Sequence, residues 1–593
     1  MRRGAAVVAL GLVTPLLVTV GASGAATDPW SAADPDRPAR AGTTAASGVV
    51  VPADVDLSSR GRPLRYGTPR QAGLVPRHLD RLGADLRRYL QPSPEHPLYA
   101  GGVVLAARRG VIAVHDAAGH AVRYQDAAIE LPPAERVAAR PDTIYDLASV
   151  TKTFTSIAVM QQVESGVVDL DEPVATYLPE FGAAGKEAIT VRQLLTHTGG
   201  LPAWIPLYSR YPTIEERRAA VLAVAPTAPP GEQYVYSDLG MITLGMLVEE
   251  VTGRRLDQVV HDDITEPLRM RDTMFDPPAS LRPRIAATEP QPWAGRPMIR
   301  GEVHDENAWS LGGVAGHAGL FSTAHDLAVL AQTLLNGGRY RGSRILEEDT
   351  VRTMLTNENA AFPGDSHGLG FELDQRWYMD GMSSPVTFGH TGFTGTSFVV
   401  DPLAESFVVL LTNRVHPTRD WGSNNPARRA VAQDLARAVA VRPTEGRTAW
   451  FSGLGDARNA TLTLPVDPIL PGPLQVGFDL WYDTEAGYDL ASLEISADDG
   501  ATWEPLPFTL RRGDTETPTD GTVSGFAGRV WHRADAVTDV GAGPVLLRWR
   551  YRTDGLYQGR GVYVDRVRVT GSGGERLDDE RALAPDGWRA SRD

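Results

Sequence analysis

The character of the sequence changes abruptly near residues 442–446, and this change constrains the fold more than any other feature. Before it, over residues 64–441, short apolar runs typical of strands alternate with runs of helical period. Beyond it, helical periods vanish and short stretches of alternating apolar and polar residues follow one another. At 593 residues the chain is also too long for one hydrophobic core. We therefore expect a mixed α/β domain followed by an all-β domain.

Strand-like runs occur at both ends of the first domain, at residues 102–107 and 111–114 and again at 398–400 and 407–411. Helical patterns fill the region between them. This arrangement predicts a single sheet completed by the two ends of the domain, with the helical middle packed on or beside it. A cleft between the sheet and the helical part is the expected place for a site.

The second domain is predicted to be a β-sandwich over residues 446–570. Residues 496–503, Ser-Ala-Asp-Asp-Gly-Ala-Thr-Trp, predict a hairpin turn in which an aspartate hydrogen-bonds its own loop and a tryptophan packs beneath it. Residues 571–593 are interpreted as a polar tail. The predicted strands are residues 474–481, 491–496, 545–551 and 562–569.

The first residues have the layout of a secretory signal peptide. Arg2 and Arg3 precede an apolar run over residues 5–20, and small residues continue to Ala26. We expect a signal peptide over residues 1–26, a flexible linker over 27–63, and a protein that is secreted or held in the cell envelope. An uncleaved membrane anchor is the alternative, but the apolar run is short for a bilayer span.

Composition excludes several classes of site and partner. The formal net charge of −15 disfavours a nucleic-acid partner, because such proteins need a basic face. The absence of cysteine excludes disulfides and thiolate metal sites. No stretch beyond the signal is apolar for long enough to give a stable membrane span after cleavage.

The stretch Ser149-Val150-Thr151-Lys152 carries the strongest chemical signal. Among 58 Lys and Arg residues only Lys152 and Lys186 are lysines, so arginine serves almost everywhere else. Arginine stays protonated in proteins, whereas a desolvated lysine can lose its proton and act as a base. The helical pattern that follows places Ser149 at a helix N-terminus, where free N–H groups favour an oxyanion, and the spacing puts Lys152 on the same face. A serine cap followed by a surface lysine is the alternative.

Two further motifs follow in order. Tyr236-Ser237-Asp238 lies between a Pro-Pro-Gly turn and a predicted helix, so its tyrosine is expected on a loop facing the cleft. His390-Thr391-Gly392 leads into a late strand, and its glycines would let a substrate lie along the backbone. Each motif is weak alone, because a loop tyrosine more often packs and a histidine before Thr-Gly is common in turns.

Together these motifs resemble the serine β-lactamase and penicillin-binding-protein family, in its class C-like and DD-peptidase-like or esterase-like branch. The resemblance covers about residues 64–441. It implies an α/β fold with an antiparallel sheet, flanking helices and a helical subdomain. The stretches that carry it are SVTK at 149–152, YSD at 236–238, HTGFTGT at 390–396, LLTHTGGLP at 194–202, GHAGLFS at 316–322 and LLTNR at 410–414.

The resemblance implies roles for individual residues. Ser149 would be the acylated nucleophile, Lys152 its proton partner, and Tyr236 the group that passes a proton to and from the leaving group. The backbone amides of Ser149 and Phe393 would form the oxyanion hole, with Thr391 and Gly392 beside the substrate.

The motifs depart from the family pattern at two positions. Asp238 stands where the family has asparagine, and a carboxylate near Lys152 would hold its amine charged, which moves the base role toward Tyr236. His390 replaces a lysine and is largely neutral at pH 7, so it would bind a substrate carboxylate more weakly. Arg414 is a candidate replacement anchor for that carboxylate.

We expect no cofactor and no catalytic metal. His197, His304, Asp305 and His317 could be gathered into a metal site only on paper, because none has the tight spacing of histidine ligands.

The C-terminal domain resembles the MAM-like sandwich of immune-inhibitor-A-type proteins, on residues 496–503 and on Gly559-Arg560-Gly561-Val562-Tyr563-Val564-Asp565. A glycan or protein ligand of this sandwich and a passive spacer are open alternatives.

The sequence therefore predicts a secreted serine hydrolase that forms an acyl-enzyme on a cell-wall peptide or a small acyl substrate, as a DD-carboxypeptidase does. A carboxylesterase or β-lactamase of the same fold is one alternative. A penicillin- or muropeptide-binding protein without turnover is the other.

Overall fold

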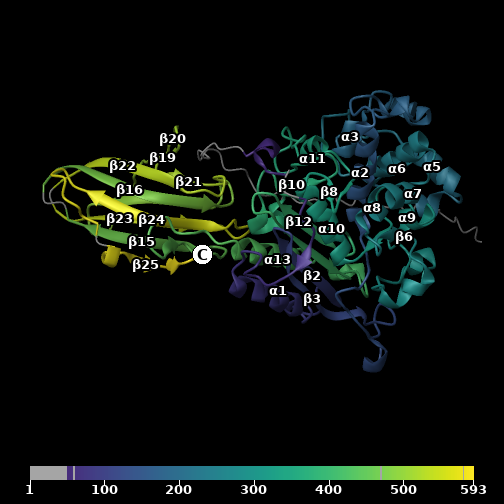
Figure 1. The fold of residues 1–593 in the computed structure, drawn as a ribbon, viewed down its shortest axis with the longest axis horizontal. Coiled ribbons are helices and arrows are strands. Elements are labelled where there is room, and N and C mark those ends of the chain that lie inside the picture. The colour runs from purple at the N-terminus through teal and green to yellow at the C-terminus, as the bar shows by residue number, and fades with distance from the viewer. Residues whose placement is uncertain (1–49, 58–60, 468–469, 542, 579) are drawn as a thin grey trace, which may run out of the picture. The chain divides into compact units, whose positions relative to one another are not determined.

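The computed structural model describes residues 50–57, 61–467, 470–541, 543–578 and 580–593 (Figure 1). The predicted signal peptide over 1–26 and most of the predicted linker over 27–63 lie outside these residues. The described end of that linker is not free chain, because Val55 and Leu57 are buried in the core of the first domain. The linker prediction is wrong for this end, where two apolar side chains gain by packing.

The first domain contains an eight-stranded sheet in the order β1-β3-β2-β13-β12-β11-β10, with β4 beside β3. β2 and β13 pair antiparallel, with Gly102 opposite Thr412, so the two ends of the domain complete one sheet as predicted. β1 and β3 pair in parallel. The strands are β1 (Arg65–Tyr66), β2 (Gly101–Arg108), β3 (Val111–Val122), β4 (Val137–Ala138), β10 (Glu372–Leu373), β11 (Phe388–Thr391), β12 (Ser397–Asp401) and β13 (Ser406–Thr412).

Helices pack against this sheet on both faces. Val103 and Leu105 of β2 join the main core together with α10 (Ala324–Leu335), whereas Val104 and Ala106 lie outside that core and point the other way. α1 (Pro76–Arg88) and α13 (Asn425–Ala438) pack on each other and against the sheet. The sheet is therefore buried on both sides, which explains its nearly continuous apolar strands.

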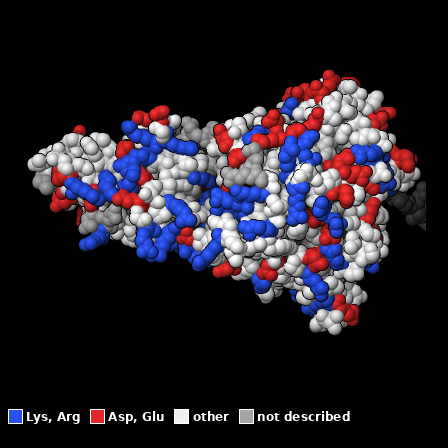
Figure 2. All heavy atoms as spheres, in the orientation of Figure 1, with Lys and Arg blue, Asp and Glu red and all other residues white. Residues whose placement is uncertain are grey.

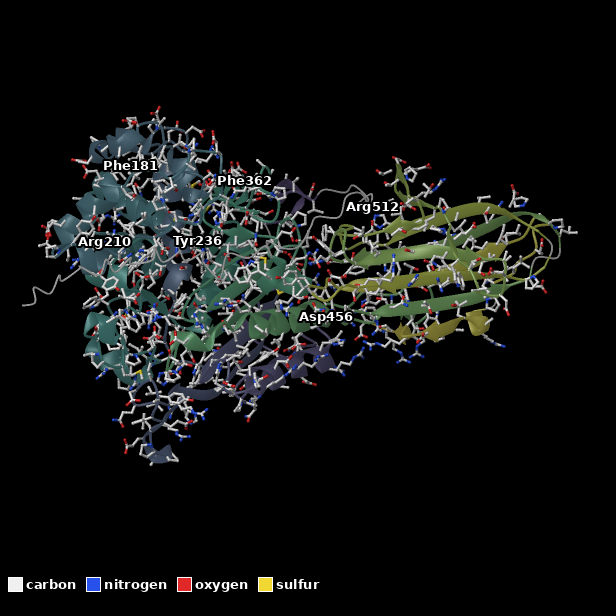
Figure 3. The ribbon with its side chains drawn as sticks, turned by 180° about the vertical axis from the view of Figure 1, so that it is seen from behind. Phe181, Arg210, Tyr236, Phe362, Asp456 and Arg512 are labelled. Atoms are coloured by element: carbon white, nitrogen blue, oxygen red, sulfur yellow. The ribbon has the colours of Figure 1, made fainter. Side chains whose placement is uncertain are left out.

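The middle of the domain is helical. α2 (Thr151–Glu164) packs against α6 (Asp238–Thr252), and both are buried over most of their length. Figure 3 shows this helical part with Phe181 and Arg210 in it and Tyr236 nearer the sheet. The other helices of the domain are α3 (Val191–Leu195), α4 (Leu207–Arg210), α5 (Ile214–Ala223), α7 (Leu256–Val260), α8 (Glu266–Leu268), α9 (Glu306–Ser310), α11 (Glu348–Met354) and α12 (Arg376–Met379).

Three short strands, β5 (Tyr145–Asp146), β6 (Met274–Phe275) and β7 (Leu320–Ser322), form a small separate sheet. β5 is the strand that precedes α2 in the chain. β8 (Arg339–Tyr340) pairs with β9 (Ser343–Arg344).

The C-terminal region consists of two antiparallel sheets around its own apolar core, as the alternating pattern predicts. The seven-stranded sheet has the order β20-β19-β22-β16-β24-β14-β26, and the six-stranded sheet has β18-β17-β23-β15-β25 with β21 beside β17. The strands are β14 (Ala449–Phe451), β15 (Asn459–Val466), β16 (Gly472–Asp483), β17 (Leu490–Ser496), β18 (Glu504–Pro505), β19 (Thr509–Arg512), β20 (Thr515–Pro518), β21 (Thr522–Val523), β22 (His532–Val540), β23 (Val545–Arg552), β24 (Gly561–Thr570), β25 (Ala584–Asp586) and β26 (Arg589–Ser591).

The last residues are not a polar tail. β25 pairs with β15, and β26 pairs with β14 at the edge of the seven-stranded sheet. Trp588 is buried in the sandwich core. The tail prediction over 571–593 failed because these strands have three residues each, too few to show an alternating pattern.

The predicted hairpin turn after β17 is present. Asp498 accepts hydrogen bonds from the backbone N–H and the hydroxyl of Thr502, at 2.8 and 2.6 Å, and from the hydroxyl of Ser496. The indole N–H of Trp503 donates to the carbonyl of Gly500. The turn is therefore stabilised by its own side chains.

On the face drawn in Figure 2, acidic and basic side chains are interspersed. None of the helices within the described residues combines the length and the apolar character that crossing a bilayer requires.

Candidate active site

Ser149 lies in a single 3₁₀ turn, Ala148–Val150, that leads directly into α2. Ala148 has a φ of 47°, in the left-handed region that residues with a side chain rarely adopt. Asp146 fixes this turn, because its carboxylate accepts the N–H of Ala148 at 2.8 Å and the N–H of His304 at 2.6 Å. The chain therefore turns sharply at the serine, which stays half-buried at the helix N-terminus as predicted.

Lys152 brings the candidate residues together. Its Nζ lies 2.8 Å from Ser149 Oγ and 2.8 Å from Asp238 Oδ1, and it donates to the carbonyl of His317 at 3.3 Å. The same nitrogen lies 4.7 Å from the centre of the Tyr236 ring. Since the Lys152 side chain is only 1% exposed, the alternative of a surface lysine is excluded. A buried amine that contacts a serine hydroxyl can exchange a proton with it.

The Tyr-Ser-Asp motif forms the N-terminal end of α6. Ser237 caps the helix by accepting the N–H of Gly240, and Asp238 is the first helical residue. His197 contacts two residues of the motif. Its Nδ1 accepts the N–H of Ser237 at 3.1 Å, and its ring centroid lies 4.5 Å from that of Tyr236. The tyrosine thus reaches the lysine from a loop that a buried histidine positions.

Three buried histidines near Tyr236 favour the neutral form. Burial lowers the pKa of His367 to about 4. Burial, followed by the charges of nearby groups including Lys152, holds the pKa values of His197 and His390 well below the usual range. These rings therefore add polar atoms but no charge to the site at neutral pH.

The His-Thr-Gly segment spans the end of β11 and the loop after it, and this loop is tied to the chain before Ser149. Thr394 donates to the carbonyl of Asp146 at 2.7 Å, and Thr396 donates to the carbonyl of Leu147 at 2.9 Å. A Cβ on Gly392 would lie 2.2 Å from Thr396 Oγ1 and 2.3 Å from the carbonyl oxygen of Leu147, so only glycine fits there. The loop and the nucleophile turn therefore form one packed unit.

His390 has a defined tautomer. Its Nδ1 lies 2.8 Å from the carbonyl oxygen of Thr391, and a nitrogen at that position must carry the hydrogen. In the neutral ring Nε2 is then a hydrogen-bond acceptor.

The hypothesis that Arg414 anchors a substrate carboxylate is not supported. Its guanidinium is buried and donates to the carbonyls of Phe393, Arg419 and Gly422 at 2.8, 3.0 and 2.8 Å. It also lies 4.6 Å from the centre of the Phe393 ring. Sequence reasoning could place Arg414 after a strand but not tell which way its side chain turns.

Asp305 and His317 form a second pair beside the lysine, at 2.9 Å between His317 Nε2 and Asp305 Oδ1. Burial alone would raise the pKa of Asp305, but His317 and the N–H of Ala308 outweigh it, so this pKa lies well below the usual range. In the sequence, Asp305 and His317 were considered only as metal ligands, and their pairing was not predicted. The only available signal was the position of the histidine in the glycine-rich stretch Gly316-His317-Ala318-Gly319.

Asp238, Asp305 and His317 each offer an atom within 4.8 Å of the others, so by distance they could hold a metal ion. A metal would have to displace Lys152 from Asp238 and His317 from Asp305. The other histidines considered from the sequence lie elsewhere, since His197 packs on Tyr236 and His304 pairs with Glu289. In the sandwich, Glu485, Asp489 and Asp554 likewise each offer an atom within 4.8 Å of the others.

Comparison with known proteins gives two family matches. A family model described as beta-lactamase matches residues 86–433, and one described as immune inhibitor A-like, MAM domain, matches residues 419–591. A protein of Salmonella agona (strain SL483), named "Putative D-alanyl-D-alanine carboxypeptidase", is 32% identical over 390 residues, which cover 60% of this chain and 86% of the relative.

Two solved structures are also similar to this chain. A penicillin-binding protein homologue from Caulobacter crescentus is 22% identical, with a TM-score of 0.48, and the match covers 61% of this chain and 97% of that one. EstCE1, a hydrolase with promiscuous acyltransferase activity, is 22% identical, with a TM-score of 0.48, and the match covers 62% and 99%.

Proposed function

Because this chain belongs to the beta-lactamase family, it is a serine hydrolase, and we propose that it is a secreted DD-carboxypeptidase of peptidoglycan-type peptides. One observation carries the proposal: Ser149 Oγ lies 2.8 Å from the buried Nζ of Lys152, which also contacts Asp238. The name of the Salmonella agona relative supports the peptide substrate. Export rests on the signal-like residues 1–26.

In the proposed acylation, Ser149 Oγ attacks the substrate carbonyl carbon and its proton passes into the Lys152–Tyr236 pair. The N–H groups of Ser149 and Phe393 stabilise the oxyanion. The tetrahedral intermediate then expels the leaving amine, which takes the proton back through Tyr236. A water molecule then attacks the carbonyl carbon of the acyl-enzyme and gives a proton to the Lys152–Tyr236 pair. The bond to Ser149 Oγ breaks, the serine regains its proton from the pair, and the acid is released.

The contacts of Lys152 support an electrostatic part for it in this scheme. The carboxylate of Asp238 lies 2.8 Å from Nζ and forms an ion pair with the ammonium group, which donates to Ser149 Oγ. The resting amine is then an electrostatic partner of the serine, and Tyr236, with Lys152 4.7 Å from its ring centre, is the proposed base.

A carboxylesterase activity is the second candidate, and His390 favours it. The neutral ring presents an acceptor at Nε2, not a cation, in the loop that would bind the terminal carboxylate of a peptide. Because Arg414 is engaged with backbone carbonyls, it does not supply that charge. An uncharged ester has no carboxylate, so its binding would not need a cation in this loop.

Three substrates separate these activities: a D-alanyl-D-alanine peptide, a nitrophenyl ester and a fluorescent penicillin. Each is given to the purified chain, to Ser149→Ala and to Ser165→Ala, a matched serine at the opposite end of α2. We expect release of D-alanine by the chain and by Ser165→Ala, and none by Ser149→Ala. Full activity of Ser149→Ala on any substrate would refute the nucleophile. Turnover of the ester alone would favour the esterase, and a stable penicillin adduct without any turnover would favour a binding protein.

A further inference from the structure

A buried arginine holds the peptide bond between Gly392 and Phe393. Arg428 lies on the first turn of α13 and is 4% exposed. Its Nη2 donates to the carbonyl of Gly392 at 2.7 Å and to the carbonyl of Thr396 at 3.0 Å. Its Nη1 donates to Asn425 Oδ1 at 2.7 Å.

The charge of Arg428 is costly where it lies. All three oxygens that accept its hydrogen bonds are uncharged, and a buried cation bonded to neutral groups costs free energy relative to water. Burial lowers its pKa to about 10, although the nearby Glu372 and Tyr378 partly oppose this fall, so the guanidinium is charged at neutral pH.

The peptide that Arg428 holds is the one that carries the Phe393 N–H. A trans peptide is planar, and its C=O and N–H point in opposite directions. Fixing the Gly392 oxygen therefore also fixes the direction of the Phe393 N–H, on the side away from the guanidinium. The peptide has little freedom to turn, because Gly392 is packed against Thr396 and Leu147.

We propose that Arg428 is a positioning residue of the oxyanion hole and acts through the Gly392–Phe393 peptide. It orients the Phe393 N–H and draws electron density toward the Gly392 oxygen, which makes that N–H a stronger donor to the oxyanion. This inference rests on the proposed function, in which the Phe393 N–H stabilises the oxyanion formed when Ser149 attacks.

Arg414 holds the next carbonyl in the same way. Its Nη2 donates to the Phe393 oxygen at 2.8 Å, and its guanidinium packs on the Phe393 ring. Both carbonyls that flank the Phe393 N–H are thus bound by guanidinium groups. This double attachment explains why two arginines are buried behind one short loop.

The test compares Arg428→Met, Arg428→Lys and the control Arg429→Met, which removes the neighbouring arginine of the same helix. Steady-state rates on the best substrate separate kcat from KM. Infrared difference spectra of the acyl-enzyme, made with a carbonyl-labelled substrate, report the stretching frequency of the acyl C=O, which falls as oxyanion-hole hydrogen bonds strengthen.

For Arg428→Met we expect the acylation rate to fall by about 10- to 100-fold, less than the loss of a whole donor, with KM nearly unchanged. The acyl C=O frequency should rise in Arg428→Met and rise less in Arg428→Lys, which keeps the charge but not the two-carbonyl fork. Arg429→Met should match the wild type in both measurements.

Wild-type rates together with an unshifted C=O frequency in Arg428→Met would overturn the inference. If that variant is unstable, the spectrum remains decisive, because only molecules that have folded and reacted contribute an acyl C=O band, and Arg428→Lys repeats the test. Lost activity with an unshifted band would mean that Arg428 is merely structural, which also overturns it. If the wild type forms no acyl-enzyme, the proposed function fails first.

Discussion

Replacing Asp238 by asparagine tests how the charge next to Lys152 governs the reaction. The variant keeps the size and one hydrogen-bonding oxygen of the side chain but removes the carboxylate that lies 2.8 Å from Nζ. It also restores the residue that the family pattern has at this position. The charge of Lys152 is then unbalanced, and it stabilises the phenolate of Tyr236, the proposed base, more strongly.

The size of the effect follows from the charge separation. Two unit charges about 4 Å apart, in surroundings with an effective dielectric constant near 20, interact with an energy of about 4 kcal/mol. Since one pH unit corresponds to about 1.4 kcal/mol, loss of the whole interaction between the carboxylate and the phenolate equals about 3 pH units. The asparagine dipole retains part of it. We therefore expect the acid limb of the kcat/KM profile to move to lower pH by about 1 to 3 units.

The assay is the initial rate of nitrophenyl ester hydrolysis across both limbs of the profile, corrected with Ser149→Ala. Asp171→Asn is the matched control, because Asp171 pairs with Arg192 through a side chain that is 71% exposed and such pairs contribute little. An acid limb that stays where the wild type has it would refute the inference that the charge of Asp238 governs the proposed base. A limb that moves to higher pH would refute it as well.

Three further predictions concern the lysine, a buried histidine and the domain boundary. In Lys152→Arg the charge stays but deprotonation is lost; because Tyr236 is the proposed base, acylation measured by active-site titration should stay within about 10-fold of the wild type, whereas a fall of about 100-fold or more would mean that Lys152 itself gives up a proton. Because burial lowers the pKa of His367 from 6.5 to about 4, the unfolded chain binds the extra proton between these values, and stability falls as pH drops from 6.5 to 4. Between pH 6.5 and pH 4 the free energy of unfolding, measured with denaturant, should decrease by about 3 kcal/mol less in His367→Gln than in the wild type. An unchanged pH dependence would contradict the assignment. Removal of residues 446–593 should leave ester hydrolysis intact, because the two regions have separate apolar cores, and a truncated chain that does not fold would refute the boundary.

Local features of the site could be predicted from the sequence. Ser149 and Lys152 are three residues apart, so helical geometry alone brings them together, and the structure has them in contact. Tyr236 and Asp238 begin a helix at a recognisable cap, and both reach Lys152. The paired ends of the sheet could also be predicted, because they depend on apolar patterns that run over several residues.

Features that depend on tertiary packing could not be predicted. Arg414 and Arg428 are ordinary arginines in a chain that uses arginine nearly everywhere, and only the fold shows that both bind carbonyls behind the His-Thr-Gly loop. The pairing of Asp305 with His317 joins the N-cap of α9 to an irregular segment, and no periodic pattern predicts such a contact. The boundary between α13, which ends at Ala438, and β14, which begins at Ala449, agrees with the change in pattern near 442–446.

The pairing of β2 with β13 has a consequence for how this enzyme is made. Gly102 pairs with Thr412, and Thr394 and Thr396 hydrogen-bond to the chain just before Ser149. The contacts around the nucleophile are therefore incomplete until the ribosome has translated these late residues. Contacts so distant along the chain are slow to form, because a long loop must close first. We therefore expect a nascent chain that carries only the serine and the lysine to be inactive, and activity to arise only after the late strands have joined the sheet.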